Sequence, residues 1–371
     1  MRKTGLVRVA GAMSGTSLDG VDAAIIETDG IAVASTGPSR YRAYSDTERS
    51  VLRAGLGTWP GEPAAQAAAR VVEAAHVDVL TDLLADPESG EVDAIGVHGQ
   101  TLAHAPGGRG THQAGDGRRL ANAMGYPVVW DFRSADVHLG GQGAPLAPAY
   151  HFAMTQSAGL DAPVAVLNLG GVGNFTWLDP RAAGPDADGA LLAFDTGPAN
   201  APLDDHVADW LGMAYDSGGV LASEGAVDAA TIAQFAEHPY FLRMPPKSLD
   251  RNDFSALVAA ADTMSAADGA ATLTAAVAVG VLRGVEHFPA PISRVLVTGG
   301  GRKNPVMMKM IAEALDVPVD PVESIGFDGD MVEAQAFAYL AVRVMRGLPT
   351  TFPSTTGVGA AVGGGEVSRP G

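Results

Sequence analysis

The chain has 371 residues, 47% hydrophobic and 18% charged, so it is long enough to bury two hydrophobic cores. Its formal net charge of -18 disfavours nucleic acids and acidic membrane surfaces as partners, because both favour a basic protein face. Without cysteine it has no disulfide, thiolate metal ligand or thiol nucleophile. We therefore expect a compact soluble enzyme or binding protein, in which an anionic ligand must meet a local cluster of Arg and Lys.

The first residues, 1–9, lack a sustained apolar core, which predicts no signal peptide. We also find no apolar run that approaches the roughly 20 residues of a membrane helix, so no membrane span is expected. The expected compartment is the cytoplasm.

The first motif is a strand over 6–10 that breaks into a glycine turn within 11–22 and resumes over 23–28. Bare backbone amides and several hydroxyls in this turn suit a phosphate. Asp19 and Asp22 are candidate Mg²⁺ ligands beside it. The alternative for each Asp is a turn residue that accepts hydrogen bonds from its own backbone.

A strand end carries the next candidates. Helical spacing over 47–56 and 63–84 predicts scaffold helices, and 92–97 then reads as a short buried strand that ends at His98–Thr101. Ligands of open α/β sheets bind at strand ends, which favours a ligand contact here and makes Thr101 a candidate. A structural histidine in the core is the alternative for His98.

Arg133 follows a predicted strand over 127–130. Its planar guanidinium matches a carboxylate, which makes it a candidate for an anionic substrate. The alternative is a surface ion pair with Asp131 or Asp136. Residues 140–148 are too rich in Gly and Pro for regular structure, and we expect them to cross between two lobes.

A second glycine turn lies between apolar runs at 164–167 and 175–178. A dinucleotide-binding fingerprint would need a helix directly after the glycines, whereas 175–178 alternates like a strand. Either the glycines only make a hairpin turn, or their amides approach an anion. Because this strand, turn and strand repeat the first motif, we expect two duplicated lobes with a ligand's phosphates between them.

Asp195 directly follows the apolar run 191–194, so it is a candidate catalytic acid or base.

A polar loop over 245–254 follows later in the chain, in which Lys247 and Arg251 could guide an anionic ligand. The helix expected over 265–285 is alanine-rich scaffold.

A third glycine turn, 298–305, joins a strand to a helix that begins near Val306. Its flat backbone and the free amides of the helix start suit the base, ribose or phosphate of a nucleotide. Glu333 lies in the first turn of a later helix, where the alternative to a ligand contact is a helix-dipole role. The glycine-rich tail from Gly357 is expected to be loose.

Together these motifs resemble the anhydro-N-acetylmuramic acid kinase family, in the same order and over nearly the whole chain. The segments that carry the resemblance are Gly11–Asp22, His98–Thr101, Gln113–Gly117, Asp131–Pro148, Leu167–Thr176, Phe194–Asn200, Thr298–Pro305 and Glu333–Leu340. The chain departs from the family's pattern in the loop 247–254 and after Thr356.

The resemblance implies an α/β fold of the actin, sugar kinase and Hsp70 type, with two ribonuclease-H-like lobes around a central cleft. We expect lobes at 1–140, joined by the tail 345–371, and at 141–344. It also implies a homodimer with small-molecule substrates. The implied reaction opens the 1,6-anhydro ring of anhydro-N-acetylmuramic acid and phosphorylates the sugar with ATP, a step of peptidoglycan recycling.

Carried over residue by residue, the resemblance places the catalytic base at Asp195 and substrate contacts at Thr101, Arg133 and Glu333. ATP and Mg²⁺ are the implied cofactors, with Mg²⁺ near Asp19 or Asp22. The expected ATP site comprises Gly15, Thr16, Ser17, Leu18, Asp19, Gly20, Val21, Asp22, Gly170, Gly171, Asn174, Gly299, Gly300 and Asn304.

Two other functions stay open from the residues. An ordinary sugar or acyl kinase would use Asp195 to deprotonate a substrate hydroxyl instead of water. A nucleotide-dependent binding protein or chaperone would use ATP only as a switch.

Overall fold

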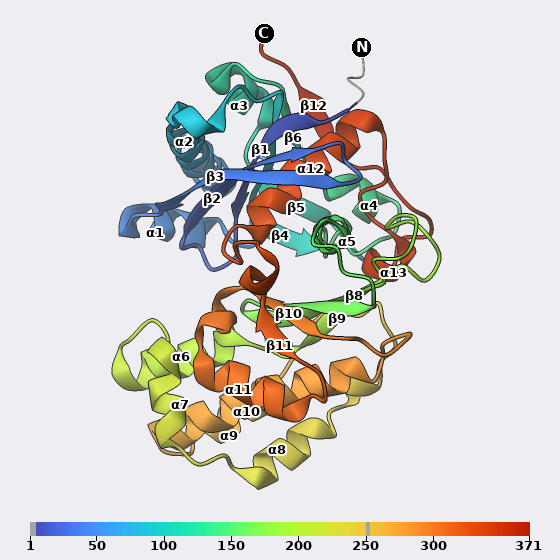
Figure 1. Ribbon diagram of the computed structural model, residues 1–371. Coiled ribbons are helices and arrows are strands. Elements are labelled where there is room, and N and C mark those ends of the chain that lie inside the picture. Colours follow the sequence, from blue (N-terminus) through green and yellow to red (C-terminus); the bar gives the residue numbers. More distant parts are fainter. Residues whose placement is uncertain (1–4, 250–252) are drawn as a thin grey trace. The chain divides into compact units, whose positions relative to one another are not determined.

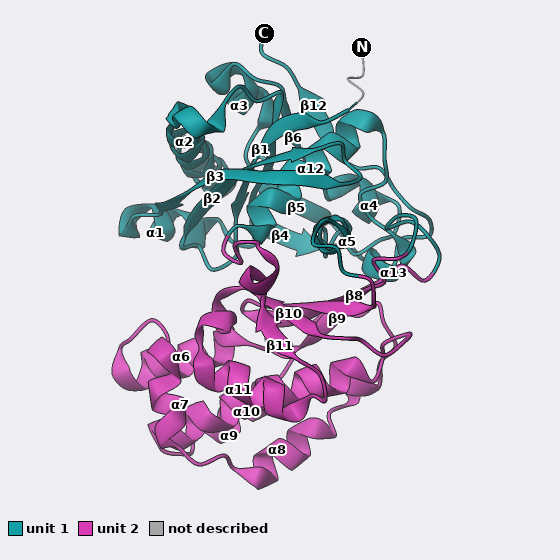
Figure 2. Ribbon diagram, viewed as in Figure 1, with its two compact units in different colours: residues 1–160, 182–188, 331–371 teal, residues 161–181, 189–330 magenta. Residues whose placement is uncertain are grey.

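The computed structural model describes residues 5–249 and 253–371. The chain forms two compact units (Figure 2). Unit 1 comprises 1–160, 182–188 and 331–371, and unit 2 comprises 161–181 and 189–330.

These limits differ from the lobes expected from the sequence, because two helices belong to unit 1. Helix α5 (Pro148–Ser157) packs on β3 (Val33–Ala43) and on α12 (Val332–Arg346). Unit 1 therefore runs past the Gly- and Pro-rich segment 140–148 and includes the whole of α12.

Unit 1 is built on a mixed seven-stranded sheet (Figure 1). The strands run in the order β12-β6-β4-β1-β2-β3, and β5 pairs with β4. Strands β1, β2 and β3 are antiparallel neighbours, whereas β4 is parallel to both β1 and β6. The other bounds are β1 Val7–Ser14, β2 Gly20–Thr28, β4 Ala94–Ala105, β5 Gly110–Ala114, β6 Val128–Trp130, β12 Glu366–Ser368, α1 Asp46–Gly55, α2 Pro63–Ala85, α3 Gly117–Met124, α4 Ser134–His138 and α13 Pro353–Thr356.

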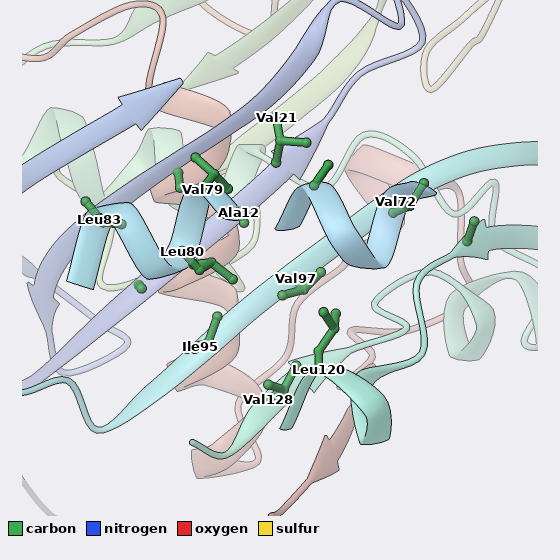
Figure 3. Close-up of a cluster of buried hydrophobic side chains, with 14 of the residues drawn as sticks. Ala12, Val21, Val72, Val79, Leu80, Leu83, Ile95, Val97, Leu120 and Val128 are labelled. Carbon is green, nitrogen blue, oxygen red and sulfur yellow. The ribbon is translucent and has the colours of Figure 1, made fainter. Parts of the chain in front are cut away.

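One face of this sheet packs on α2, and Figure 3 shows the resulting hydrophobic core. Ala12 of β1 and Val97 of β4 point toward Val79 and Leu80 of α2 in this cluster. Alternate residues of a strand point to opposite faces, so their neighbours in sequence face α12.

Glycines make that opposite face flat. A Cβ atom at Gly11 would overlap the carbonyl oxygen of Ala334, and one at Gly96 would overlap that of Phe337. The backbone of α12 can therefore lie directly against β1 and β4. This close approach requires glycine at both positions.

Unit 2 contains a five-stranded sheet in the order β11-β10-β7-β8-β9. Its strands are β7 Val164–Leu169, β8 Val172–Leu178, β9 Leu191–Pro198, β10 Val295–Thr298 and β11 Val319–Pro321. Its helices are α6 Asn200–Leu211, α7 Val220–Glu224, α8 Ala229–Ala236, α9 Ser255–Ala261, α10 Ala266–Val285 and α11 Pro305–Ala314.

Both sheets repeat one arrangement. In each, three antiparallel strands joined in sequence lie beside two parallel strands, as β1-β2-β3 with β4 and β6, and as β7-β8-β9 with β10 and β11. This repeat agrees with the expected duplicated, ribonuclease-H-like units.

Helix α10 corrects one expectation. Among the residues that the structure describes, it is long and apolar enough to cross a membrane by length and composition alone, with a mean hydropathy of 1.3. Two thirds of it is buried (67%), and it packs on α6, α8, α11 and β9 as the core helix of unit 2.

Strand β4 and the tail also differ from the predictions. β4 continues through His98–Thr101 to Ala105, because its second half pairs with β5. The tail after Gly357 is not loose: β12 pairs with β6, and Val362 forms a bridge with Thr351.

We predict that Gly96→Ala destabilises the protein. The added methyl overlaps the Phe337 carbonyl oxygen and lies 2.9 Å from the Ala341 methyl, so α12 must move away from β4. Overpacking of this kind costs about 1–3 kcal/mol in the free energy of unfolding, which urea titration measures. Gly107→Ala is the control, because no atom lies within 4 Å of its Cβ position. Equal stability of the two variants would contradict the prediction.

Candidate active site

The first glycine turn is a hairpin loop, Gly15–Asp19, between β1 and β2, as predicted. Leu18 is buried in this loop and has a φ of 57°, in the left-handed region that costs a non-glycine residue energy. Its amide donates to the carbonyl of Gly15 at 3.2 Å. Val21 and Asp22 lie in β2, directly after the loop.

Free donors remain in this turn. In the described part of the chain, the amides of Thr16 and Ser17 donate to no protein group. Asp19 Oδ1 accepts from the hydroxyl of Ser17 at 2.7 Å and from the amide of Gly20 at 3.1 Å. Asp19 thus accepts hydrogen bonds from its own turn, the alternative role considered from the sequence, and its Oδ2 accepts from no group in the part of the chain that the structure describes.

A Mg²⁺ ion fits this loop only together with a ligand. Among the described residues, no group of three or more His, Asp or Glu side chains is placed to hold a metal ion. Mg²⁺ held on nucleotide phosphates needs only one or two carboxylates, however. Desolvation raises the pKa of Tyr41, and the charges of Asp19 and Asp22 raise it further, so both carboxylates lie near this ring and both remain candidates.

Thr101 lies where β4 exchanges partners. The parallel pairing with β1 ends at Gln100, and the antiparallel pairing with β5 begins there. Thr101 Oγ1 accepts from Gln113 Nε2 at 3.1 Å. The buried Gln100 donates to the Thr101 carbonyl and accepts from the hydroxyl of Ser14 at 2.6 Å. This network connects Thr101 to the strand that carries the first turn.

Arg133 forms no ion pair within the described residues, so the surface ion pair considered from the sequence is wrong. Its Nε donates to His98 Nε2 at 3.0 Å and its Nη1 to the carbonyl of Gly143 at 2.6 Å. Asp131 accepts from Ser134, and Asp136 accepts from Gly143 and Thr356. Desolvation lowers the pKa of Arg133 to about 10, which keeps it protonated at neutral pH.

Glu333 lies in the first turn of α12 with an exposed side chain. Desolvation raises its pKa, Arg133 opposes the shift, and Asp19 adds to it. Unit 1 thus brings Arg133, Glu333 and Asp19 within electrostatic reach of one another.

The second turn, Gly170–Gly171, joins β7 to β8 as a tight hairpin. Its carbonyls accept from the first amides of α6: Asn200 donates to Gly170 at 2.9 Å, and Ala199 donates to Gly171 at 3.1 Å. The amides of the two glycines have no backbone acceptor among the described residues. They remain available to an anion, whereas those of the α6 start do not.

Three hydrogen bonds hold Asp195 in place. Its amide donates to the carbonyl of Lys247 at 3.0 Å, and its carbonyl accepts from the hydroxyl of Tyr240 at 2.5 Å. Its carboxylate oxygen Oδ2 accepts from the amide of Leu249 at 2.8 Å. Asn174 is its partner across β8 and β9. No group in the described part of the chain occupies Oδ1, which is free for a reactant.

Burial raises the pKa of Asp195 to about 6, and the hydrogen bond from Leu249 opposes the shift. The side chain is half-buried in β9, which continues past it to Pro198. A carboxyl with such a pKa is ionised at neutral pH yet basic enough to accept a proton, as a general base requires.

A small hollow of unit 2 is lined in part by Leu249, whose amide binds this carboxylate. It has a volume of about 230 Å³, open solvent included, and Leu249 is among its walls. Its lining residues are Gly171, Val172, Gly197, Pro198, Ala201, Pro202, Leu249 and Phe254. The second turn and the residue that binds the Asp195 carboxylate therefore border one space.

The third turn differs from its prediction. Gly299 has a φ of 77° and packs so tightly that a Cβ would overlap Asn168 Oδ1. Asn304 caps α11, and its Oδ1 accepts from the amides of Val306 and Met307 at 3.1 Å each. The free amides expected at this helix start are thus occupied. Gly300 is exposed beside them.

The cations near these turns are mostly neutralised or turned inward. Arg302 pairs with Glu323 and Asp330, and Lys303 also pairs with Asp330. Lys247 Nζ lies 3.0 Å from His287 Nε2 and 4.6 Å from the centre of the Tyr240 ring, so it does not guide a ligand. Arg251, the other expected guide, lies outside the described residues.

Sequence reasoning missed three contacts of the candidate residues. His98 and Gly143 bind Arg133, and the Leu249 amide binds Asp195. His98 had a signal in its position near a strand end. A backbone carbonyl or amide leaves no signal in a sequence.

Comparisons with known proteins agree over the whole chain. A family model described as anhydro-N-acetylmuramic acid kinase matches residues 7–368. A protein of that name from Cereibacter sphaeroides is 63% identical over 370 residues, which cover 100% of this chain and 98% of that protein. One from Ruegeria sp. is 60% identical over 368 residues, covering 99% and 96%. One from Roseobacter denitrificans is 56% identical over 369 residues, covering 100% and 96%.

We predict that Asp195→Asn gains stability relative to the natural protein as the pH rises. The folded carboxyl has a pKa of about 6, above the unfolded value of about 3.9, so the folded state binds more protons between these values. The contribution of Asp195 is therefore most favourable below about pH 4 and is lost as the pH rises through about 6. Asparagine carries no charge and avoids this loss.

Urea unfolding of both proteins between about pH 4 and pH 7.5 measures the difference. Asp209→Asn, at an exposed position of α6, is the matched control. A stability difference that stays constant over this range would contradict the prediction.

Proposed function

The chain belongs to the anhydro-N-acetylmuramic acid kinase family, and from this premise we propose how its residues carry out that reaction. It is an ATP-dependent kinase of peptidoglycan recycling. It opens the 1,6-anhydro ring of anhydro-N-acetylmuramic acid and yields N-acetylmuramic acid 6-phosphate and ADP. Family membership sets aside a chaperone that would use ATP only as a switch.

The reaction couples hydrolysis to phosphoryl transfer. Water attacks the anomeric carbon, the bond from that carbon to the oxygen on carbon 6 breaks, and this oxygen bonds to the γ-phosphorus of ATP while ADP departs. Asp195 takes the proton of the attacking water. Because phosphorus captures the leaving oxygen, no separate general acid is needed.

The observation that carries this proposal is the state of the Asp195 carboxylate. It is anchored through Oδ2, its Oδ1 accepts from no group in the described residues, and its pKa is about 6. A positioned general base contributes roughly 10²–10⁴-fold to the rate. The half-buried position favours proton transfer, because water solvates the charge less there than at an exposed site.

We assign nucleotide binding to the glycine turns. The free amides of Thr16 and Ser17 and those of Gly170 and Gly171 support phosphate binding. Asp19, with one oxygen unused, would hold Mg²⁺ together with the phosphates, where the ion neutralises negative charge. Gly299 and Gly300 supply a flat backbone for the base or ribose, and Asn304 acts by shaping this turn.

We assign the lactyl carboxylate of the substrate to Arg133. Arg133 is a half-buried guanidinium that forms no ion pair within the described residues, and Glu333 and Asp136 act on its charge only at longer range. This supports the assignment, because a half-buried guanidinium with unused donors suits a carboxylate. Thr101 and Glu333 are proposed contacts to the sugar's polar groups. A homodimer in the cytoplasm remains part of the proposal and rests on the family resemblance.

We predict that Asp195→Asn lowers turnover by at least about 10²-fold, because the amide cannot take a proton from water. ATP binding should change little, since the amide keeps the shape of the carboxylate. ADP release in the presence of the anhydro sugar measures turnover, and calorimetry measures ATP affinity. Asp209→Asn again serves as the control. Near-normal turnover in Asp195→Asn would show that the base is another residue.

We predict that, in water labelled with oxygen-18, the reaction places one solvent oxygen at the anomeric carbon of the product. Ring opening by water requires this, whereas an ordinary kinase, in which Asp195 deprotonates a substrate hydroxyl, takes no oxygen from the solvent. Mass spectrometry of product quenched soon after mixing detects the label, because a free anomeric hydroxyl exchanges slowly with water. Unlabelled product would favour the ordinary kinase.

A further inference from the structure

His98 lies in β4 and is 5% exposed, with both ring nitrogens bonded. Nδ1 lies 2.9 Å from the carbonyl of Gly99, and Nε2 lies 3.0 Å from Arg133 Nε. A carbonyl oxygen only accepts and an arginine Nε only donates. Nδ1 therefore carries the hydrogen, and the Nε2 lone pair receives Arg133.

The ring of His98 has little freedom to turn. It contacts the ring of Phe337 at a centroid distance of 4.7 Å, and Phe132 packs on the same phenylalanine at 5.3 Å. Desolvation, with the charge of Arg133, lowers the pKa of His98 well below its ordinary value. The imidazole thus stays neutral and remains an acceptor at neutral pH.

A second fixed acceptor holds the other side of the guanidinium. The carbonyl of Gly143 accepts from Arg133 Nη1, while the amide of Gly143 donates to Asp136 Oδ1 at 2.7 Å. Asp136 is 1% exposed, and its other oxygen accepts from the hydroxyl of Thr356 at 2.7 Å. This series of hydrogen bonds fixes the position of the Gly143 carbonyl.

Two fixed acceptors, at Nε and at Nη1, define the plane of the guanidinium. Of its five N–H donors, both on Nη2 and one on Nη1 remain unused by the described residues. Nη1 and Nη2 together form the end-on edge, which can bind a carboxylate through two parallel hydrogen bonds. The geometry therefore leaves one suitable edge of Arg133 open.

We propose that His98 is a positioning residue that orients Arg133 for the carboxylate of the substrate. The inference rests on the proposed assignment of the lactyl carboxylate to Arg133. Without the acceptor at Nε2, the half-buried Nε–H loses its partner and the guanidinium rotates to find another. The open edge then no longer faces the carboxylate.

Paired substitutions test this role. His98→Phe keeps a planar ring against Phe337 but removes the acceptor, whereas the amide oxygen of His98→Gln can occupy the place of Nε2. We expect His98→Phe to raise KM for the anhydro sugar acid roughly tenfold, as the loss of a buried donor's partner does. KM for ATP should be unchanged, and His98→Gln should restore most of the affinity for the sugar.

The methyl ester of the lactyl group separates positioning from general damage to the fold. The ester has the same sugar but no carboxylate charge, so its KM should be similar in the natural enzyme and in His98→Phe. A thermal melt checks that each variant is folded. If His98→Phe does not fold, His98→Asn, whose shorter amide does not reach Nε, replaces it as the variant without an acceptor.

Several results would overturn the inference. These are an unchanged KM for the acid in folded His98→Phe, an equal rise of KM for acid and ester, or no recovery in His98→Gln. A natural enzyme that turns over neither acid nor ester would instead refute the proposed function, and this inference with it. Turnover by the natural enzyme together with any of the first three results would refute the role of His98 alone.

Discussion

The close contact of α12 with the glycines of β1 and β4 determines the candidate site of unit 1. Without side chains at Gly11 and Gly96, the helix backbone lies directly on the sheet. This depth places Glu333 at the start of α12, and it places Phe337 one turn further on, against the ring of His98. His98 in turn holds Arg133. A shift of α12 would therefore disturb packing and ligand binding together.

The candidate base in unit 2 depends on a balance of two opposing effects. Burial raises the pKa of Asp195, whereas one backbone amide, that of Leu249, lowers it. More amides on the carboxylate would lower its pKa and make it a weaker base, and the loss of this one would raise the pKa further. One hydrogen bond leaves the pKa of about 6 that suits a base at neutral pH.

The sequence predicted the repeated hairpins and most helices, because these depend on local periodicity and residue type. It did not predict that β4 continues to Ala105 or that the tail after Gly357 is packed, because both depend on pairing with distant strands. Asn304, predicted to contact the nucleotide, also caps α11, and an Asn directly before a proline at a helix start is a capping signal. The partners of Arg133 and Asp195 come from elsewhere in the chain or from backbone atoms, which no residue type reveals.

Recognition of an anion by this acidic chain must act at short range. With a net charge of -18, the protein repels an anionic substrate at a distance, although salt screens this repulsion beyond about 8 Å. Arg302 and Lys303 offset little of it, because Glu323 and Asp330 neutralise them. What remains in the described structure is a small set of donors, namely the free amides of the first and second turns and the open edge of Arg133. In the proposed site, affinity for the anion then depends on how rigidly these donors are held, so the neutral His98 that accepts from Arg133 would contribute to it.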